Sequence, residues 1–100
     1  MRATKAAVVH LVHLAAVELA AYDIRVNGIA PGPFFTNIAG GRLHRDPEVV
    51  KMFADAVPLG RIAQPEEIQG LALLLASGAS SFITGTVIPI DGGISAGRVG

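Results

Sequence analysis

The sequence predicts an α/β protein that forms one flank of a larger parallel sheet and is incomplete by itself. The expected elements follow in the order helix, strand, helix, helix, strand, which is one crossover unit of a parallel sheet preceded by an extra helix. Two strands alone make a poor sheet, because a lone pair is rarely stable in water. In addition, 51% of the 100 residues are apolar, which is high for a small domain and indicates apolar faces that something outside the chain covers.

The first helix is expected over residues 3–21, which are rich in Ala, Leu and Val and contain neither Gly nor Pro. A helix that is apolar nearly all round is normally buried on more than one side. We therefore expect one face to pack on a sheet and another on a partner subunit. A short strand is expected over residues 24–30, and it should end at Pro31-Gly32-Pro33 because proline cannot donate to a ladder.

The second half of the chain is expected to complete the crossover. Residues 34–45 are predicted to be a loop. Residues 46–56 begin with Asp-Pro-Glu, which predicts a helix with Asp as N-cap and Pro at the first helical position. A further helix is predicted over residues 65–78, with Gly78 as a C-terminal cap. The last strand is expected over residues 86–90, and Asp91-Gly92-Gly93 closes it as a turn.

Composition argues against several classes of partner. The formal net charge is zero and no basic stripe is present, so we expect no nucleic-acid partner. There is no cysteine, which excludes disulfides and thiolate metal sites. We find no secretory signal pattern and no uninterrupted apolar run of about 18 to 20 residues, so no membrane span is expected. The cytoplasm is the expected location.

Three segments follow one another in a recognisable order. Residues 3–7 read Ala-Thr-Lys-Ala-Ala, and residues 25–36 read Arg-Val-Asn-Gly-Ile-Ala-Pro-Gly-Pro-Phe-Phe-Thr. The third comprises Pro58-Leu59-Gly60-Arg61, Pro65-Glu66-Glu67-Ile68, Thr84-Gly85 and Asp91-Gly92-Gly93. These segments resemble the Tyr-x-x-x-Lys-Ala helix, the Val-Asn-x-x-x-Pro-Gly-x-x-x-Thr stretch and the C-terminal motifs of short-chain dehydrogenases/reductases. Each is weak alone, but their order and spacing cover nearly the whole chain.

The resemblance implies a Rossmann-type doubly wound sheet that binds NAD or NADP, with hydride transfer between an alcohol and a carbonyl. Lys5 occupies the position of the family's catalytic lysine, which holds the nicotinamide ribose and lowers the pKa of a tyrosine one helical turn earlier. Residues i and i+4 share a helix face, and a nearby cation favours a phenolate over a phenol. The apolar first helix and last strand also resemble surfaces through which such enzymes form homo-oligomers.

The same resemblance assigns the turn after the first strand to the cofactor. Pro31, Gly32 and Phe34 match positions that lie against the nicotinamide, and Thr36 matches a residue that hydrogen-bonds it. Gly32 permits close backbone approach, and Pro31 stiffens the turn. Residues 37–57 match the variable substrate lid, in which three side chains are candidates to face a substrate: Ile38, Leu43 and Phe53.

The sequence departs from the family pattern at the tyrosine position, where Met1 stands and a thioether cannot exchange a proton. Tyr22, the single tyrosine, falls at the far end of the first helix. The upstream serine and a G-x-G-x-x-G phosphate loop are also absent from these residues. We therefore expect the chain to be truncated and inactive alone. The alternative is a non-catalytic fragment that pairs with itself or with an intact relative.

Simpler interpretations stay open for each candidate residue. Lys5 could be a solvated surface charge, Pro31-Gly32 a strand-ending turn, and Thr36 a helix cap. His10 and His13 lie three residues apart on one helix. No third ligand follows them at metal-binding spacing, so we expect interface or surface histidines and no metal site.

Overall fold

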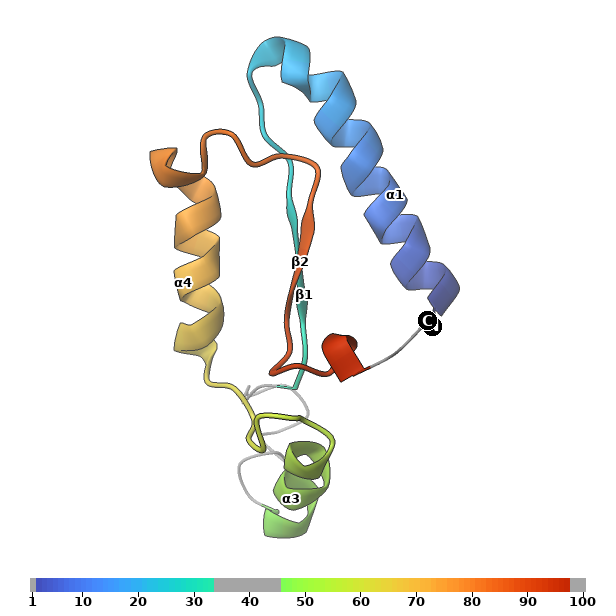
Figure 1. The fold of residues 1–100 in the computed structure, drawn as a ribbon, viewed down its shortest axis with the longest axis vertical. Coiled ribbons are helices and arrows are strands. Elements are labelled where there is room, and N and C mark those ends of the chain that lie inside the picture. Colours follow the sequence, from blue (N-terminus) through green and yellow to red (C-terminus); the bar gives the residue numbers. More distant parts are fainter. Residues whose placement is uncertain (1, 34–45, 98–100) are drawn as a thin grey trace. The chain divides into compact units, whose positions relative to one another are not determined.

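The computed structural model describes residues 2–33 and 46–97. In chain order the elements are α1 (Arg2–Leu19), η1 (Ala20–Tyr22), β1 (Gly28–Pro31), α3 (Pro47–Asp55), α4 (Pro65–Ala76), η3 (Gly78–Ser80), β2 (Val87–Ile90) and η4 (Ser95–Gly97) (Figure 1). β1 and β2 pair in a two-stranded sheet. The Gly28 amide donates to the Thr86 carbonyl and the Gly32 amide to the Ile90 carbonyl. In both bonds the acceptor lies the same number of residues after the donor, so the strands are parallel. The predicted α/β class is confirmed.

The described chain divides into two compact units. Unit 1 takes in Met1–Ala30 and Leu71–Ile88, and unit 2 takes in Pro31–Gly70 and Pro89–Gly100. The division passes through β1, α4 and β2, so each of these elements contributes one end to each unit. The two units are described separately below.

In unit 1, α1 lies beside the start of β1 (Figure 1), where a Cβ atom on Gly28 would be 3.5 Å from a methyl carbon of Val12. The less exposed side chains of the helix are Val9, Val12, Ala15, Ala16 and Leu19, whose spacing places them on one side of an α-helix. Ala16 is only 4% exposed. A Cβ atom on Gly85 would lie 3.4 Å from the Cβ atom of Ala16, so the glycine allows the helix to lie close to the loop before β2.

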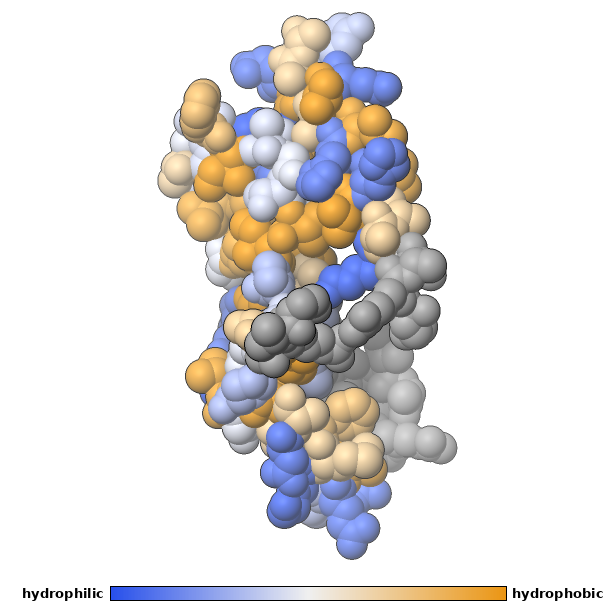
Figure 2. Space-filling view, turned by 45° about the vertical axis from the view of Figure 1, so that its right-hand side comes forward, coloured by the Kyte–Doolittle hydropathy of each residue, from blue (hydrophilic) through white to orange (hydrophobic). Residues whose placement is uncertain are grey.

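The other face of α1 is apolar and open to solvent. Leu11 is 65% exposed and Val17 is 77% exposed, and Val8 and Leu14 are also exposed. Figure 2, in which the side bearing α1 is turned forward, shows apolar surface on this face. The prediction of a helix that is apolar on more than one side agrees with this arrangement.

Arg25 connects the segment before β1 to the end of α4, within unit 1. One guanidinium nitrogen, Nη1, donates to the carbonyls of Leu75 and Ser80 at 3.0 and 2.8 Å and to the Ser80 hydroxyl at 2.9 Å. The other, Nη2, donates to the Ser77 carbonyl at 3.2 Å. Ser80 is 1% exposed. The guanidinium therefore satisfies carbonyls that a helix leaves unpaired at its C-terminus, where positive charge is favoured.

The predicted strand over residues 24–30 is wrong at its start, because β1 begins at Gly28. In the residues just before β1, hydrogen bonds to side chains take the place of a regular backbone ladder. The Val26 amide donates to the Thr84 hydroxyl, and the Asn27 side chain donates to the Ile83 carbonyl and accepts from the Thr86 amide. At the other end, Pro31 belongs to the strand, one residue beyond the predicted end.

The prediction of Gly78 as the C-terminal cap of this helix is also wrong. The helix ends at Ala76, and Gly78 is not among the glycines with positive φ. Gly78 instead begins η3, and the Ser77 hydroxyl accepts from the Ala79 amide as the N-cap of that turn. Ser77 therefore caps a new helical turn at the point where a glycine cap was predicted.

In unit 2, α3 begins as predicted. The Asp46 carboxylate accepts from the Glu48 amide at 3.0 Å, and Pro47 occupies the first helical position. Val57 and Ile62, the two buried apolar residues in the described part of the unit, are 5% and 4% exposed and lie in the loop between α3 and α4. This loop is the centre of unit 2 and borders the candidate site.

Candidate functional site

Lys5 lies in unit 1, near the start of α1, and its side chain is exposed. It borders an open groove of about 530 Å³ that is lined by Lys5, Ala6, Val9, His10 and His13. Among the side chains that the structure describes, Lys5 makes no ion pair, since the two ion pairs found there involve Lys51 and Arg61.

The two histidines of α1 belong to the same groove. They lie three residues apart, so their side chains share a face of the helix. Within residues 2–33 and 46–97 there is no group of three or more His, Cys, Asp or Glu residues that could hold a metal ion. Both histidines are exposed, which agrees with surface residues, and their role at an interface stays a prediction.

The turn that follows β1 lies in unit 2 and is held by the end of β2. The Gly32 amide donates to the Ile90 carbonyl at 3.1 Å. A Cβ atom on Gly32 would lie 2.8 Å from the Cβ atom and 2.9 Å from the Cα atom of Asp91. Glycine is therefore required here by internal packing, a reason that the sequence analysis did not include.

Asp91 organises the loop after β2. Its carboxylate accepts hydrogen bonds from the Gly93 amide at 3.0 Å, from the Ser95 amide at 3.1 Å and from the Ser95 hydroxyl. The Ser95 hydroxyl is the main reason why the pKa of Asp91 lies below its ordinary value, with the Gly93 and Ser95 amides contributing. Because its oxygens are engaged by its own loop, Asp91 acts as a turn residue, as the sequence analysis expected.

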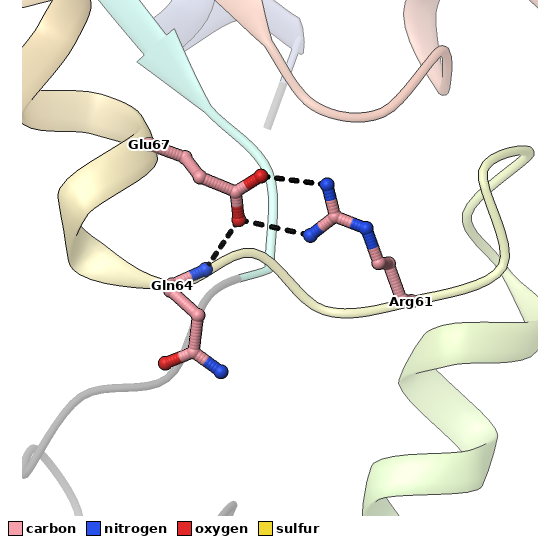
Figure 3. A network of polar contacts seen from close by, with 3 residues as sticks. All are labelled: Arg61, Gln64 and Glu67. Carbon is pink, nitrogen blue, oxygen red and sulfur yellow. Dashed lines mark hydrogen bonds and ion pairs between the residues drawn. The ribbon is translucent and has the colours of Figure 1, made fainter.

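A network that the sequence analysis missed lies at the start of α4 (Figure 3). Two guanidinium nitrogens of Arg61 donate to the two carboxylate oxygens of Glu67, at 2.9 and 2.6 Å. The backbone amide of Gln64 donates to the same carboxylate at 2.7 Å. These contacts lower the pKa of Glu67 from 4.5 to about 2, with the Arg61 hydrogen bonds as the largest cause and the Gln64 amide next.

Part of this network could have been predicted from the helix-capping pattern in the sequence. Gln64 precedes Pro65, and a glutamate three residues after an N-cap commonly accepts from the N-cap amide. Arg61 lies outside the helix, so its bidentate pairing with Glu67 is a feature of the loop conformation. Residue spacing alone did not predict it.

A cavity of about 250 Å³ lies in unit 2 beside the turn. Its walls include Pro33, Leu59, Arg61, Glu67 and Asp91. The ion pair therefore forms part of the same wall as the residue that follows Gly32. This proximity links the network to the predicted cofactor segment.

The structure describes only some of the predicted site residues. Lys5 belongs to unit 1, and Pro31 and Gly32 belong to unit 2. Phe53, a predicted lid residue, lies in α3 and is 38% exposed. The other predicted residues of the turn and lid lie outside the described ranges: Phe34, Thr36, Ile38 and Leu43. Tyr22 ends η1, and at about 1.5 Å of rise per residue it is roughly 25 Å from Lys5 along the helix axis.

Comparison with known proteins identifies the family. The model of the family described as Enoyl-(Acyl carrier protein) reductase matches residues 1–95. Sorbose reductase of Candida albicans is 45% identical over 91 residues, which are 91% of this chain and 31% of that protein. Galactitol 2-dehydrogenase (L-tagatose-forming) of Cereibacter sphaeroides is 40% identical over 91 residues, which are 91% of this chain and 35% of that protein.

Solved structures agree with the sequence matches. The NADP active-site complex of Pseudomonas aeruginosa RhlG superposes with a TM-score of 0.81 at 41% identity, covering 90% of this chain and 36% of that one. A short-chain type dehydrogenase/reductase from Mycobacterium ulcerans gives a TM-score of 0.82 at 41% identity, covering 96% of this chain and 34% of that one. The chain belongs to the short-chain dehydrogenase/reductase family, and its sheet is part of a Rossmann-type fold. It spans about a third of the length of these relatives.

The length and composition of α1 bear on the expectation that the chain has no membrane span. The window Lys5–Tyr22 has a mean hydropathy of 1.3, so this helix is long and apolar enough to cross a membrane by length and composition alone. Glu18 interrupts the apolar run without lowering the average below that of a spanning segment. Core helices of soluble proteins satisfy the same criterion, and the segment lies within the family match.

Proposed function

We propose that the chain forms the C-terminal third of an NAD- or NADP-dependent oxidoreductase, which transfers hydride between the nicotinamide and a small alcohol or carbonyl compound. The observation that supports this most strongly is the family match over residues 1–95, which includes the lysine and turn motifs. The NADP complex of the P. aeruginosa relative supports the class of cofactor. The nicotinamide supplies or accepts the hydride. The protein orients the nicotinamide and transfers the proton.

In this proposal Lys5 binds the nicotinamide ribose and favours the ionised form of a tyrosine that donates the proton. Its exposed position and the absence of an ion pair among the described side chains support this role. A carboxylate partner would have reduced the attraction that a bare ammonium exerts on a phenolate. An adjacent cation adjusts a phenol with an ordinary pKa of about 10 toward the working pH.

The turn supplies a rigid edge for the nicotinamide. Pro31 and Gly32 contribute backbone atoms whose position is set by the Ile90 carbonyl and by contact with Asp91. Phe34 and Thr36 follow directly in the sequence, and the family resemblance supports their contact with the cofactor. A preformed turn loses little conformational entropy when the cofactor binds.

We further propose that these 100 residues do not catalyse the reaction alone. The proton donor would have to be a tyrosine beside Lys5, and Tyr22 is too distant. Purified chain, mixed with NADH or NADPH and a panel of carbonyl compounds, should give no turnover above that of a Lys5→Ala variant. Turnover that depends on Lys5 would contradict this part of the proposal.

A hybrid enzyme tests the function itself. Residues 5–100 of this chain replace the matching third of the C. sphaeroides galactitol 2-dehydrogenase, whose own preceding residues are kept. We expect galactitol oxidation that is readily measured by the formation of reduced cofactor. A second hybrid keeps that enzyme's own residues in place of 34–57, so that loss of substrate recognition is separated from loss of the site. If both hybrids fold and bind cofactor but neither oxidises galactitol, the proposed function is wrong.

A second candidate function is association without catalysis, and the exposed apolar face of α1 favours it. Leu11 and Val17 are 65% and 77% exposed, which suits a homo-oligomer or a complex with an intact relative. Size-exclusion chromatography with light scattering tests this candidate. A folded chain that remains monomeric at high concentration would exclude it.

A further inference from the structure

We propose that Arg61 and Glu67 are positioning residues for the turn Pro31–Pro33. Their ion pair fixes the segment between them, and that segment holds the carbonyl of Pro33. The inference rests on the proposed function, because the turn is important for catalysis only if it contacts the nicotinamide.

The ion pair has the geometry that makes such contacts directional. Both Glu67 oxygens accept from Arg61, at 2.6 and 2.9 Å. A bidentate guanidinium–carboxylate pair restricts orientation as well as distance. Gln64 is bound to the same carboxylate through its amide at 2.7 Å, so residues on both sides of Ala63 are attached to Glu67.

Ala63 connects this segment to the turn. Its amide donates to the Pro33 carbonyl at 3.2 Å. Its neighbour Ile62 is 4% exposed, which anchors the segment in the apolar centre of unit 2. Consequently, the direction of the Ala63 amide depends on residues 61–64, which are bound to Glu67 at both ends.

The turn is thus held from two sides within unit 2. On one side, the Gly32 amide donates to the Ile90 carbonyl, and Gly32 contacts Asp91. On the other side, Ala63 holds Pro33. The loop that contains Ala63 is also bound to the first side, because the Leu59 amide donates to the Gly92 carbonyl at 3.1 Å. Loosening the ion pair would release the Pro33 side while the Ile90 side stays in place.

Glu66 provides a matched control. It lies beside Glu67 in the first turn of α4 and is exposed. Among the described residues it makes no hydrogen bond or ion pair through its carboxylate, whereas Glu67 makes three contacts. Replacing either residue by glutamine removes one negative charge near a helix N-terminus. Only the Glu67 change breaks the link to Arg61.

Hydrogen exchange of the full chain tests the link directly. In the unchanged chain the Ala63 amide should be protected. Glu67→Gln should speed its exchange by about tenfold or more, and Glu66→Gln should change it by less than about twofold. Arg61→Lys keeps the positive charge but loses the bidentate guanidinium contact, so its exchange rate at Ala63 should lie between those of the two glutamine variants. An unprotected Ala63 amide, or equal effects of the two glutamine variants, would overturn the proposal.

The hybrid enzyme tests the functional consequence. Glu67→Gln should raise the KM for the nicotinamide cofactor by about fivefold or more with a smaller change in kcat, whereas Glu66→Gln should leave both nearly unchanged. Faster exchange at Ala63 with an unaltered cofactor KM would overturn the positioning role. Hybrids that fold and bind cofactor but do not oxidise galactitol before any substitution would instead refute the proposed function, and the exchange experiment would still decide whether the ion pair holds the turn.

Discussion

Gly32 and Asp91 are in direct contact at the ends of two paired strands. A Cβ atom on Gly32 would be 2.9 Å from the Cα atom of Asp91, which is backbone and cannot rotate away. The Ile90 carbonyl, one residue earlier, already accepts the Gly32 amide. Side chains at position 32 are therefore excluded by the neighbouring strand end.

Gly32→Ala should destabilise the chain. Forcing a methyl group into a filled site costs about 1–3 kcal/mol. Gly78→Ala is the control, because no atom lies within 4 Å of its added Cβ, and it should be neutral or stabilising by up to about 1 kcal/mol. Urea unfolding followed by circular dichroism measures both. Similar midpoints for the two variants would contradict the contact.

Arg25→Ala should destabilise unit 1 by about 2–3 kcal/mol, since hydrogen bonds to a charged group are worth more than neutral ones and their loss leaves carbonyls without donors. The guanidinium makes four contacts with the residues at the end of α4 and in η3. Arg25→Lys should recover only part of the loss, because an ammonium cannot reproduce the planar fork. The same urea experiment measures the series, and a lysine variant as stable as the parent would show that charge alone suffices.

Glu67 should make the stability of unit 2 depend on pH. Its pKa in the folded chain is about 2, against an ordinary value of 4.5. A carboxyl whose folded pKa is lowered stabilises the fold above its unfolded pKa, and this stabilisation is lost as pH falls through the folded pKa. Stability should therefore decrease between about pH 4.5 and pH 2.

Glu67→Gln should reduce the loss of stability between about pH 4.5 and pH 2, whereas Glu66→Gln should leave this pH dependence unchanged. Exchange of the Ala63 amide at a series of pH values, corrected for the intrinsic rate, reports the effect locally. The same pH dependence in parent and Glu67→Gln chains would refute this assignment.

Leu11→Glu should weaken association of the chain. Leu11 lies on the exposed apolar face of α1 and is 65% exposed, so a charge there disfavours burial against a partner. Leu11→Ala should have a smaller effect because it removes area without adding charge. Light scattering over a range of concentrations gives the association constants. Unchanged association in the glutamate variant would show that this face is not an interface.

Local patterns predicted most of the helices correctly. The run without Gly or Pro gave α1, and the Asp46-Pro47 pair gave the start of α3. Both depend on interactions within a few residues, which sequence spacing describes well. The parallel pairing followed from the order of elements, because such strands need a long crossover.

The features that the sequence did not predict around β1 have a common physical cause, which is contact between residues far apart in the chain. Asn27 replaces a regular ladder with side-chain hydrogen bonds to Ile83 and Thr86, and the alternation of apolar residues carried no sign of this. The close approach of Gly32 to Asp91 likewise depends on strand register. Lys5 and Thr36 were identified by resemblance, which supplied roles that spacing alone does not contain.

The most direct test of the proposed oxidoreductase is the rate of galactitol oxidation by the hybrid enzyme before and after Lys5→Ala. The rate should fall by about 100-fold or more, because the substitution removes both the ribose contact and the charge that favours the phenolate. Tyr22→Phe in the same hybrid should leave the rate unchanged, since that tyrosine lies at the far end of the helix. A Lys5→Ala hybrid as fast as the parent would contradict the proposal.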